Sequence, residues 1–348
     1  MNSRIIILFA AIVCLSSCAG HKDRNIFIAK DNIFVRTEPL IDKTIEPIQC
    51  LQTDDLFGTT GIITIIDKYL VLGINSTVNR FRVLDLSDLN TVTDFLQKGN
   101  GPNEDVGLIF SQYRRVDNTN LLDVYAMNKH YIMTIDFDQL VQAGETVIVD
   151  QLVTPHNAMK AYKTSDYIIS QTYFDEDYIS IKINNVLDHM PIDTISLFGN
   201  EQYLTDYYPF FASCNSLQPN GDKMVMFMHN FDKINILDLK NNNHVSITTD
   251  KRLRPDSKLI SEMISEASVR QNTYYYYGAT TNNNIYALRI GSKINEPFKV
   301  AIQVFNWDYD YLAQFNIKEP ITTFAIDEDN SLLYGLTRDE KLYIYQLE

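Results

Sequence analysis

The chain ends with ITTFAIDEDNSLLYGLTRDEKLYIYQLE, residues 321–348. Apolar side chains alternate with polar ones along three short runs, at residues 321–326, 331–336 and 341–347. Polar turn formers separate these runs, a pattern typical of an antiparallel β-meander. Because three strands alone are marginally stable in water, the segment needs neighbouring strands.

Most of the chain repeats this meander. The strands that we predict in the first three copies lie at residues 61–66, 69–74, 80–85, 91–97; 110–116, 121–126, 131–137, 146–153; 158–163, 166–172, 177–183 and 192–198. Those of the fourth and fifth copies lie at residues 213–218, 223–228, 233–238, 244–249; 273–279, 284–290, 299–305 and 311–317. Each third strand ends with a large apolar residue and a turn former or amide, as in Leu84-Asp85 and Tyr345-Gln346, and these pairs recur about every 50 residues.

Four-stranded units at this period are typical of a β-propeller. We therefore predict an all-β fold, a six-bladed β-propeller of four-stranded antiparallel blades. The last copy has three strands, so we expect residues 45–51 to supply its fourth strand and close the ring. A longer spacing before the fifth blade contains Pro255-Asp256-Ser257 and apolar residues at helical spacing up to residue 267. This predicts one helical insertion between blades 4 and 5.

The N-terminal residues predict an exported chain. Arg4 precedes an apolar run at residues 5–13 that is too short to span a bilayer, as in a secretory signal peptide. Leu15-Ser16-Ser17-Cys18 resembles the bacterial lipobox, which implies cleavage before Cys18 and lipidation of that residue. The alternative is an ordinary signal peptide cut elsewhere. We expect a signal peptide at residues 1–17, a lipidated tether and edge segment at 18–44, and a single propeller domain at 45–348. The lipid would anchor the protein in the cell envelope, on either face of the outer membrane.

The charge and the cysteines narrow the possible partners. A formal charge of −14 at pH 7 repels phosphate backbones and anionic headgroups, which argues against nucleic acid and leaves the lipid anchor as the membrane contact. Apart from Cys14 and Cys18, only Cys50 and Cys214 remain. The repeat register places them in blades far apart, so we expect two buried free thiols, with a disulfide as the alternative. We also expect a monomer.

Gly99-Asn100-Gly101-Pro102-Asn103-Glu104 follows the first blade and resembles the G-x-G-P-x-E turn of the TolB-like six-bladed β-propeller lipoproteins of Bacteroidota, whose architecture is NHL-like. Val304-Phe305-Asn306-Trp307-Asp308 resembles the end of a fifth-blade strand in that family, and residues 324–336 resemble its last blade. The resemblance covers nearly the whole chain after residue 17. It implies the fold and the envelope location, and little about function.

Motifs for the commoner chemistries are missing from the sequence. Gly99, Gly101, Pro102 and Glu104 lack the third glycine and following helix of a dinucleotide-binding loop, so we interpret them as a structural turn in which Glu104 accepts backbone N–H bonds. There is no H-E-x-x-H, no paired C-x-x-C and no G-x-S-x-G, and we predict no metal and no cofactor. We also interpret Trp307, Asp308 and Asp310 as a structural turn rather than as a sugar or calcium site.

One rim of the ring carries the candidate site. In a propeller, the loops that join second and third strands emerge at the same end as the loops between blades. The candidate ligand-binding residues on this rim are His130, Tyr131, His156, Tyr173, Asp175, Asp177, His229, Asn230 and Arg338. Their convergence favours a non-catalytic binding or scaffold module for a glycan, a peptide or an envelope protein.

The alternative is a propeller enzyme of the lyase, lactonase or glycosidase type that uses the central channel. Charged side chains pointing into the channel would favour the enzyme. The predicted inner strands carry mostly apolar, Ser, Thr and Tyr side chains, and one or two of the four tyrosines at residues 274–277 are expected to line the channel. This composition favours binding over catalysis.

Overall fold

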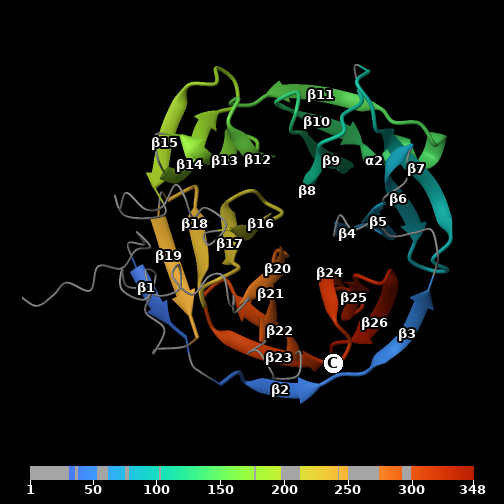
Figure 1. Ribbon diagram of the computed structural model, residues 1–348, viewed down its shortest axis with the longest axis vertical. Helices are drawn as coiled ribbons and strands as arrows, with labels where there is room; N and C mark the ends of the chain where they lie inside the picture. The colour runs from blue at the N-terminus through green and yellow to red at the C-terminus, as the bar shows by residue number, and fades with distance from the viewer. Residues whose placement is uncertain are drawn as a thin grey trace, which may run out of the picture.

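Six β-sheets stand around a central axis in the computed structural model, which confirms the predicted six-bladed β-propeller (Figure 1). The structure describes residues 31–35, 38–52, 62–74, 78–101, 103–175, 178–196, 212–241, 243–249, 274–291 and 299–348. No helix among these residues is long and apolar enough to cross a membrane.

Blades 1 to 3 are each built from four consecutive strands, with the first strand nearest the axis. Blade 1 contains β4 (Ile63–Ile66), β5 (Tyr69–Gly73), β6 (Asn79–Asp85) and β7 (Thr91–Gln97). Blade 2 contains β8 (Leu108–Val116), β9 (Thr119–Ala126), β10 (Tyr131–Asp136) and β11 (Ile148–Val153). Blade 3 contains β12 (Ala158–Lys163), β13 (Tyr167–Asp175), β14 (Tyr178–Asn185) and β15 (Pro191–Ser196).

Blades 4 to 6 recruit strands from the beginning of the chain. Blade 4 contains β16 (Ser213–Leu217), β17 (Lys223–Met228), β18 (Ile234–Asp238), β19 (Asn243–Thr248) and β1 (Asp31–Phe34). Blade 5 contains β20 (Tyr275–Thr280), β21 (Asn284–Gly291), β22 (Lys299–Asn306), β23 (Tyr311–Ile317) and β2 (Ile41–Thr44). Blade 6 contains β24 (Ile321–Asp327), β25 (Leu332–Thr337), β26 (Lys341–Gln346) and β3 (Pro47–Gln52).

The ring closes through β3, as predicted for residues 45–51. β3 pairs antiparallel with β26 from Lys341↔Gln52 to Tyr345↔Pro47, and so supplies the outermost strand of blade 6. β1 and β2 have another role, because they add in parallel to the outer strands β19 and β23. Figure 1 shows β1, β2 and β3 following one another along the outside of the ring. The sequence indicated only a weak edge segment where β1 and β2 lie.

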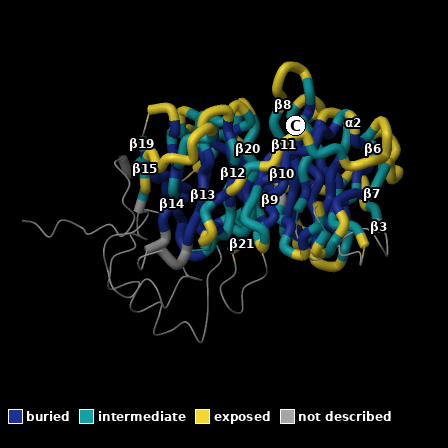
Figure 2. The backbone as a smooth tube through the Cα atoms, turned by 90° about the horizontal axis from the view of Figure 1, so that it is seen from above, coloured by how far each residue is buried: buried dark blue, intermediate teal, exposed yellow. Residues whose placement is uncertain are grey.

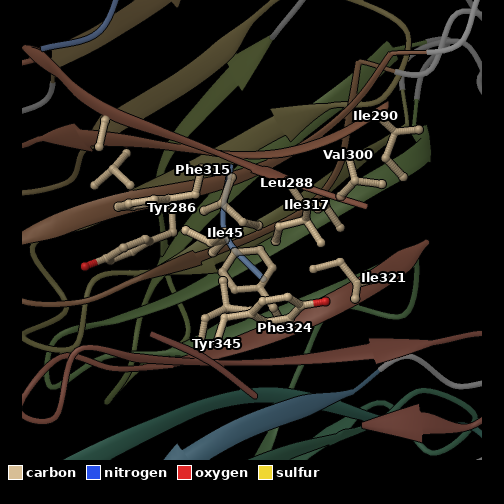
Figure 3. Close-up of a cluster of buried hydrophobic side chains, with 14 residues drawn as sticks. Ile45, Tyr286, Leu288, Ile290, Val300, Phe315, Ile317, Ile321, Phe324 and Tyr345 are labelled. Atoms are coloured by element: carbon tan, nitrogen blue, oxygen red, sulfur yellow. The ribbon is translucent and has the colours of Figure 1, made fainter. Parts of the chain in front are cut away.

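Apolar side chains fill the space between neighbouring blades. Between blades 5 and 6, Leu288, Phe315, Phe324 and Tyr345 pack in one cluster with Ile45, which lies just before β3 (Figure 3). Each such side chain contributes about 1.5–3 kcal/mol when it is fully buried. Figure 2 shows the result, with buried residues along the strands and exposed residues in the turns at both ends of the ring.

The helix that the described residues contain is α2 (Phe137–Ala143), between β10 and β11 of blade 2. Asp136 caps its N-terminus by accepting a hydrogen bond from the backbone N–H of Gln139 at 2.9 Å, and Gly144 ends it with a φ of 70°. The sequence prediction extended a strand to residue 137 and missed this helix. The helical insertion predicted near residues 255–267 lies outside the described residues.

The two cysteines of the ring are free thiols. Cys50 lies in β3 of blade 6 and Cys214 in β16 of blade 4, so they are two blades apart. Cys214 is half-buried as part of the channel wall, but Cys50 is exposed. The expected burial of Cys50 is wrong because β3 is an outermost strand.

Candidate functional site

The inner strands of all six blades enclose a central channel with a cavity of about 1290 Å³. These strands are β4, β8, β12, β16, β20 and β24, which surround the axis in Figure 1. The end where each inner strand turns into the second strand is called here the turn end. The opposite end, with the loops that join second and third strands, is called the loop end.

Charge is divided between the two ends of this channel. The charged lining residues at the turn end are Asp67, Arg115, Asp327, Glu328 and Asp329. Those at the loop end are basic or neutral: Lys160, His229 and Arg338. Every carboxylate among the described lining residues therefore lies at the turn end. Glu328 serves structure there, since it accepts hydrogen bonds from Thr281, Asn283, Asn284 and Tyr286 of blade 5.

A one-residue irregularity recurs near the beginning of four inner strands. The pairing skips Ser111 in β8, Met159 in β12, Tyr276 in β20 and Thr322 in β24. Such β-bulges change the direction of the side chains around the extra residue. In β12 and β20 they precede Lys160 and Tyr277, which both line the channel.

Lys160 is the cation that enters the channel from an inner strand near the loop end. Its ammonium donates to the carbonyl oxygen of Ser213, the first residue of β16 in the next blade, at 2.6 Å. Burial lowers the pKa of Lys160. No carboxylate among the described residues forms an ion pair with it.

A polar network holds the partner of Lys160 in place. The Ser213 hydroxyl donates to Asn215 Oδ1 at 2.7 Å, and Asn215 Nδ2 donates to Gln171 Oε1 at 2.7 Å. Ser213 is 2% exposed and Gln171 is fully buried. Because these buried groups fix one another across blades 3 and 4, the Ser213 carbonyl and the Lys160 ammonium keep a defined position.

His229 follows β17 and lies beside this lysine. Its Nδ1 is 2.6 Å from the carbonyl oxygen of Tyr275, and since a carbonyl only accepts, Nδ1 carries the proton. Burial lowers the pKa of His229, and the charge of Lys160 lowers it further, while the bond to Tyr275 acts in the opposite direction. The imidazole is therefore neutral near pH 7, with Nε2 as an acceptor.

Tyr276 and Arg338 complete the loop end on the other side. The Arg338 guanidinium lies over the Tyr276 ring at 5.6 Å and donates to its hydroxyl at 3.0 Å. The Tyr276 ring lies 6.0 Å from that of His229. Lys160, His229, Tyr276 and Arg338, one from each of blades 3 to 6, are called here the channel arc.

Cys214 adds a thiol next to Lys160 in the channel wall. Burial raises the pKa of the Cys214 thiol, and the charge of Lys160 offsets only part of that rise. The thiol is therefore protonated at neutral pH, and a protonated thiol is a poor nucleophile.

The structure separates the residues predicted for the rim. His229 and Arg338 belong to the channel arc, whereas His130 and His156 pack edge to face at 4.9 Å between their ring centres and do not line the cavity. Tyr131 begins β10 beside His130 and is half-buried.

Other rim predictions lie elsewhere or are not described. Asn230 is only 4% exposed, so it is a buried residue and not a surface one. Tyr173 and Asp175 lie in β13 by their backbone. Asp177 lies outside the described residues.

Hydrogen bonds stabilise both of the turns that we predicted as structural. Glu104 Oε2 accepts from the backbone N–H of Gly101 at 2.9 Å, and a Cβ on Gly99 would lie 2.0 Å from this oxygen, so a larger residue there would displace the Glu104 carboxylate. Pro102 lies outside the described residues. Asn306 Oδ1 accepts from the backbone N–H groups of Asp308 and Asp310, and the Trp307 indole donates to the Thr281 carbonyl at 3.3 Å.

Sequence reasoning missed two lining residues that the structure brings together. Lys160 and Cys214 come from two inner strands, and only the packing of blades places them side by side, whereas Tyr276 and Tyr277 confirm the expectation that one or two of the tyrosines at residues 274–277 line the channel. The available signal was a lysine within the otherwise apolar beginning of β12. No cluster of His, Cys, Asp and Glu suited to a metal ion occurs among the residues that the structure describes.

Two solved structures are similar to this ring. One is a member of the DUF4221 family from Bacteroides vulgatus, with a TM-score of 0.59 and 10% identity, covering 87% of this chain and 97% of that one. The other is a Bacteroides fragilis protein assigned as exported, with a TM-score of 0.55 and 11% identity, covering 90% of this chain and 98% of that one. The chain shares the fold of both. No protein-family model matches the sequence, and the comparison with curated proteins gave no match.

Proposed function

We propose that this propeller is a lipid-anchored, non-catalytic binding module of the cell envelope. Its ligand is a polar molecule, a glycan or a peptide, that lies over the loop end of the channel. The observation that carries this proposal is the channel arc, in which basic and aromatic side chains from four blades line one cavity. Such convergence of polar groups and rings on a concave surface is typical of ligand sites.

The chemistry at the loop end favours binding over catalysis. A glycosidase needs two carboxyl groups beside the scissile bond, and the described carboxylates of the channel lie at the turn end. Cys214, the thiol among the described lining residues, is held protonated by burial, which raises its pKa. A lyase or lactonase acting through the channel remains the competing hypothesis.

The location is proposed from the N-terminal sequence. Leu15-Ser16-Ser17-Cys18 supports lipidation, and a protein with the same fold from Bacteroides fragilis is assigned as exported. Two or three acyl chains on Cys18 hold a protein on a membrane far better than one. A closer relation to the TolB-like lipoproteins is part of this proposal and rests on the turn at residues 99–104.

A binding experiment with matched variants tests the function. Wild-type protein and the variant Tyr276→Ala/Arg338→Ala are applied to arrays of bacterial and host glycans and of short peptides. We expect the wild type to bind a restricted set of polar ligands and the variant to bind them at least about tenfold more weakly, since anchors of this kind contribute about 2 kcal/mol. Trp307→Ala is the control, because Trp307 lies outside the cavity lining and packs in a turn.

Two results would contradict the proposed function. Binding that survives in Tyr276→Ala/Arg338→Ala and is lost in Trp307→Ala would place the site away from the channel arc. Turnover of a bound glycan or lactone by the wild type would replace the binding module with the enzyme.

A further inference from the structure

Lys160 differs from three partly buried arginines of this ring, each of which pairs with an aspartate: Arg82 with Asp94, Arg114 with Asp123 and Arg289 with Asp232. Lys160 bonds to the neutral carbonyl of Ser213, and no described carboxylate pairs with it. A partly desolvated ammonium without an anion is costly, so its place in a cavity wall, with no carboxylate partner among the described residues, suits an anionic ligand.

The surroundings of Lys160 leave room and donors for such a partner. An ammonium has three N–H donors, and the described structure uses one of them, toward Ser213. The cavity is also lined by Asn215, the protonated Cys214 thiol and His229. None of these side chains carries a negative charge that would repel an anion.

The number of positive charges at the loop end of the channel indicates how much negative charge a ligand can carry there. One ammonium lies at this side of the channel, and Arg338 lies beyond His229 and Tyr276 at the far side of the arc. The chain as a whole carries −14, which disfavours a multiply charged anion. A singly charged carboxylate matches one ammonium, whereas a phosphate monoester carries about −1.5 to −2 at pH 7.

We infer that Lys160 binds a carboxylate group of the ligand, whose remaining polar part extends across the channel mouth from His229 over Tyr276 to Arg338. This inference rests on the proposed binding function and names its ligand class, an acidic sugar or an acidic peptide rather than a neutral glycan. An anion at Lys160 would also favour protonation of His229, so the carboxylate should bind more tightly as the pH falls toward 6.

Two small aldehydes of equal length test the carboxylate preference. Glyoxylate and glycolaldehyde differ in having a carboxylate or a neutral hydroxymethyl group. The Lys160 amine adds to either aldehyde and water leaves to give an imine, which cyanoborohydride reduces by hydride transfer to a stable secondary amine. Peptide mass spectrometry then gives the labelling of Lys160 relative to Lys240, an exposed lysine of the β18–β19 turn in the same molecule.

The preference of Lys160 for glyoxylate should exceed the difference in intrinsic reactivity between the two aldehydes. We expect the Lys160-to-Lys240 labelling ratio to be about tenfold higher with glyoxylate than with glycolaldehyde, because the positive charges at the loop end of the channel, Lys160 and Arg338, attract anions. Asn215→Asp places a carboxylate beside Lys160 and should abolish this preference. The matched control Asn220→Asp makes the same change at the turn end, and should leave the preference unchanged.

Each opposite outcome overturns a defined part of the argument. Equal ratios with both aldehydes overturn the carboxylate inference and leave the proposed binding function standing. If neither aldehyde labels Lys160 while both label Lys240, small solutes do not reach the loop end of the channel. That result overturns the proposed function as well.

Discussion

Gly278 shows how closely a single residue is constrained where blades 4 and 5 meet. A Cβ at this position of β20 would lie 2.2 Å from the ring of Phe227, which is fully buried in β17. A contact that short requires the ring or the strand to shift. The inner strand can therefore approach the neighbouring blade, and bring Tyr276 and Tyr277 to the channel, only because residue 278 lacks a side chain.

Gly278→Ala is expected to lower the free energy of unfolding by about 1–3 kcal/mol, the usual cost of overpacking a core. Urea denaturation measures it. Gly291→Ala is the control, because a Cβ there would meet no atom within 4 Å, and its effect should stay within about 0.5 kcal/mol. Equal effects of the two substitutions would contradict the packing argument.

His229 should give the ring a measurable sensitivity to acid. Since burial and Lys160 lower its pKa in the folded state, the unfolded chain, with a histidine pKa of about 6.5, takes up the proton first. The wild type should therefore lose stability relative to His229→Asn as the pH falls through 6.5. Urea titrations of both proteins at pH 7.5 and pH 5 measure the difference, and parallel curves would show that the folded imidazole has an ordinary pKa.

Some residues of the site could be predicted from the sequence and others could not. His229 and Arg338 follow from topology, because both lie in loops between a second and a third strand and such loops share one end of the ring. Lys160 could not be assigned, since the lack of a carboxylate partner depends on the neighbouring blade. Asn230 was predicted as a rim residue beside His229, but its side chain, one position further along the loop, is buried.

At the scale of elements, the turn-forming residues and the alternation of apolar and polar side chains were sufficient to predict most strands. The predicted bounds of β7, β12, β17 and β23 agree with the structure to the residue. β1 and β2 were missed because they add to outer edges, and the side chains of β2 are mostly exposed, which leaves little alternation to detect. α2 was missed because Phe137 continues the apolar pattern of β10, although Asp136 and Gly144 mark its two ends.

The closing strand makes a prediction about cooperativity. A chain that begins at residue 38 lacks β1 and should still unfold in one transition, because blade 4 keeps four antiparallel strands. A chain that begins at residue 53 lacks β2 and β3 as well. Blade 5 keeps its four antiparallel strands, but the loss of β3 leaves β26 as an open edge, so we expect a large loss of melting temperature and a broad transition. Circular dichroism during heating measures the melting temperatures of the two shortened chains. Equal melting temperatures would show that β3 is dispensable for closure.

At the scale of the whole molecule, the ring and its proposed anchor are separate parts. The fold could be predicted because the repeat is regular and each blade carries its own turn signals. The proposed ligand site could not, because it is assembled from four blades whose residues are distant in sequence.

The anchor is tested by one substitution. Cys18→Ser should move the protein from the membrane fraction to the soluble fraction, because the acylated sulfur is lost. Fractionation after a high-salt wash measures this, with Cys50→Ser as the control that keeps the lipobox residue. A Cys18→Ser protein that still sediments with membranes would show that another contact holds it there.

The outer position of β1, β2 and β3 also determines the order in which the fold can be completed. These strands come early in the chain, yet β1 needs β19, β2 needs β23, and β3 needs β26 near residue 345. As the chain is synthesised from its N-terminus, β1 must wait with unpaired backbone groups until blade 4 forms, β2 until blade 5 forms and β3 until blade 6 forms. Contacts so distant in sequence are slow to make. Each of these early strands is therefore the last to join its own blade.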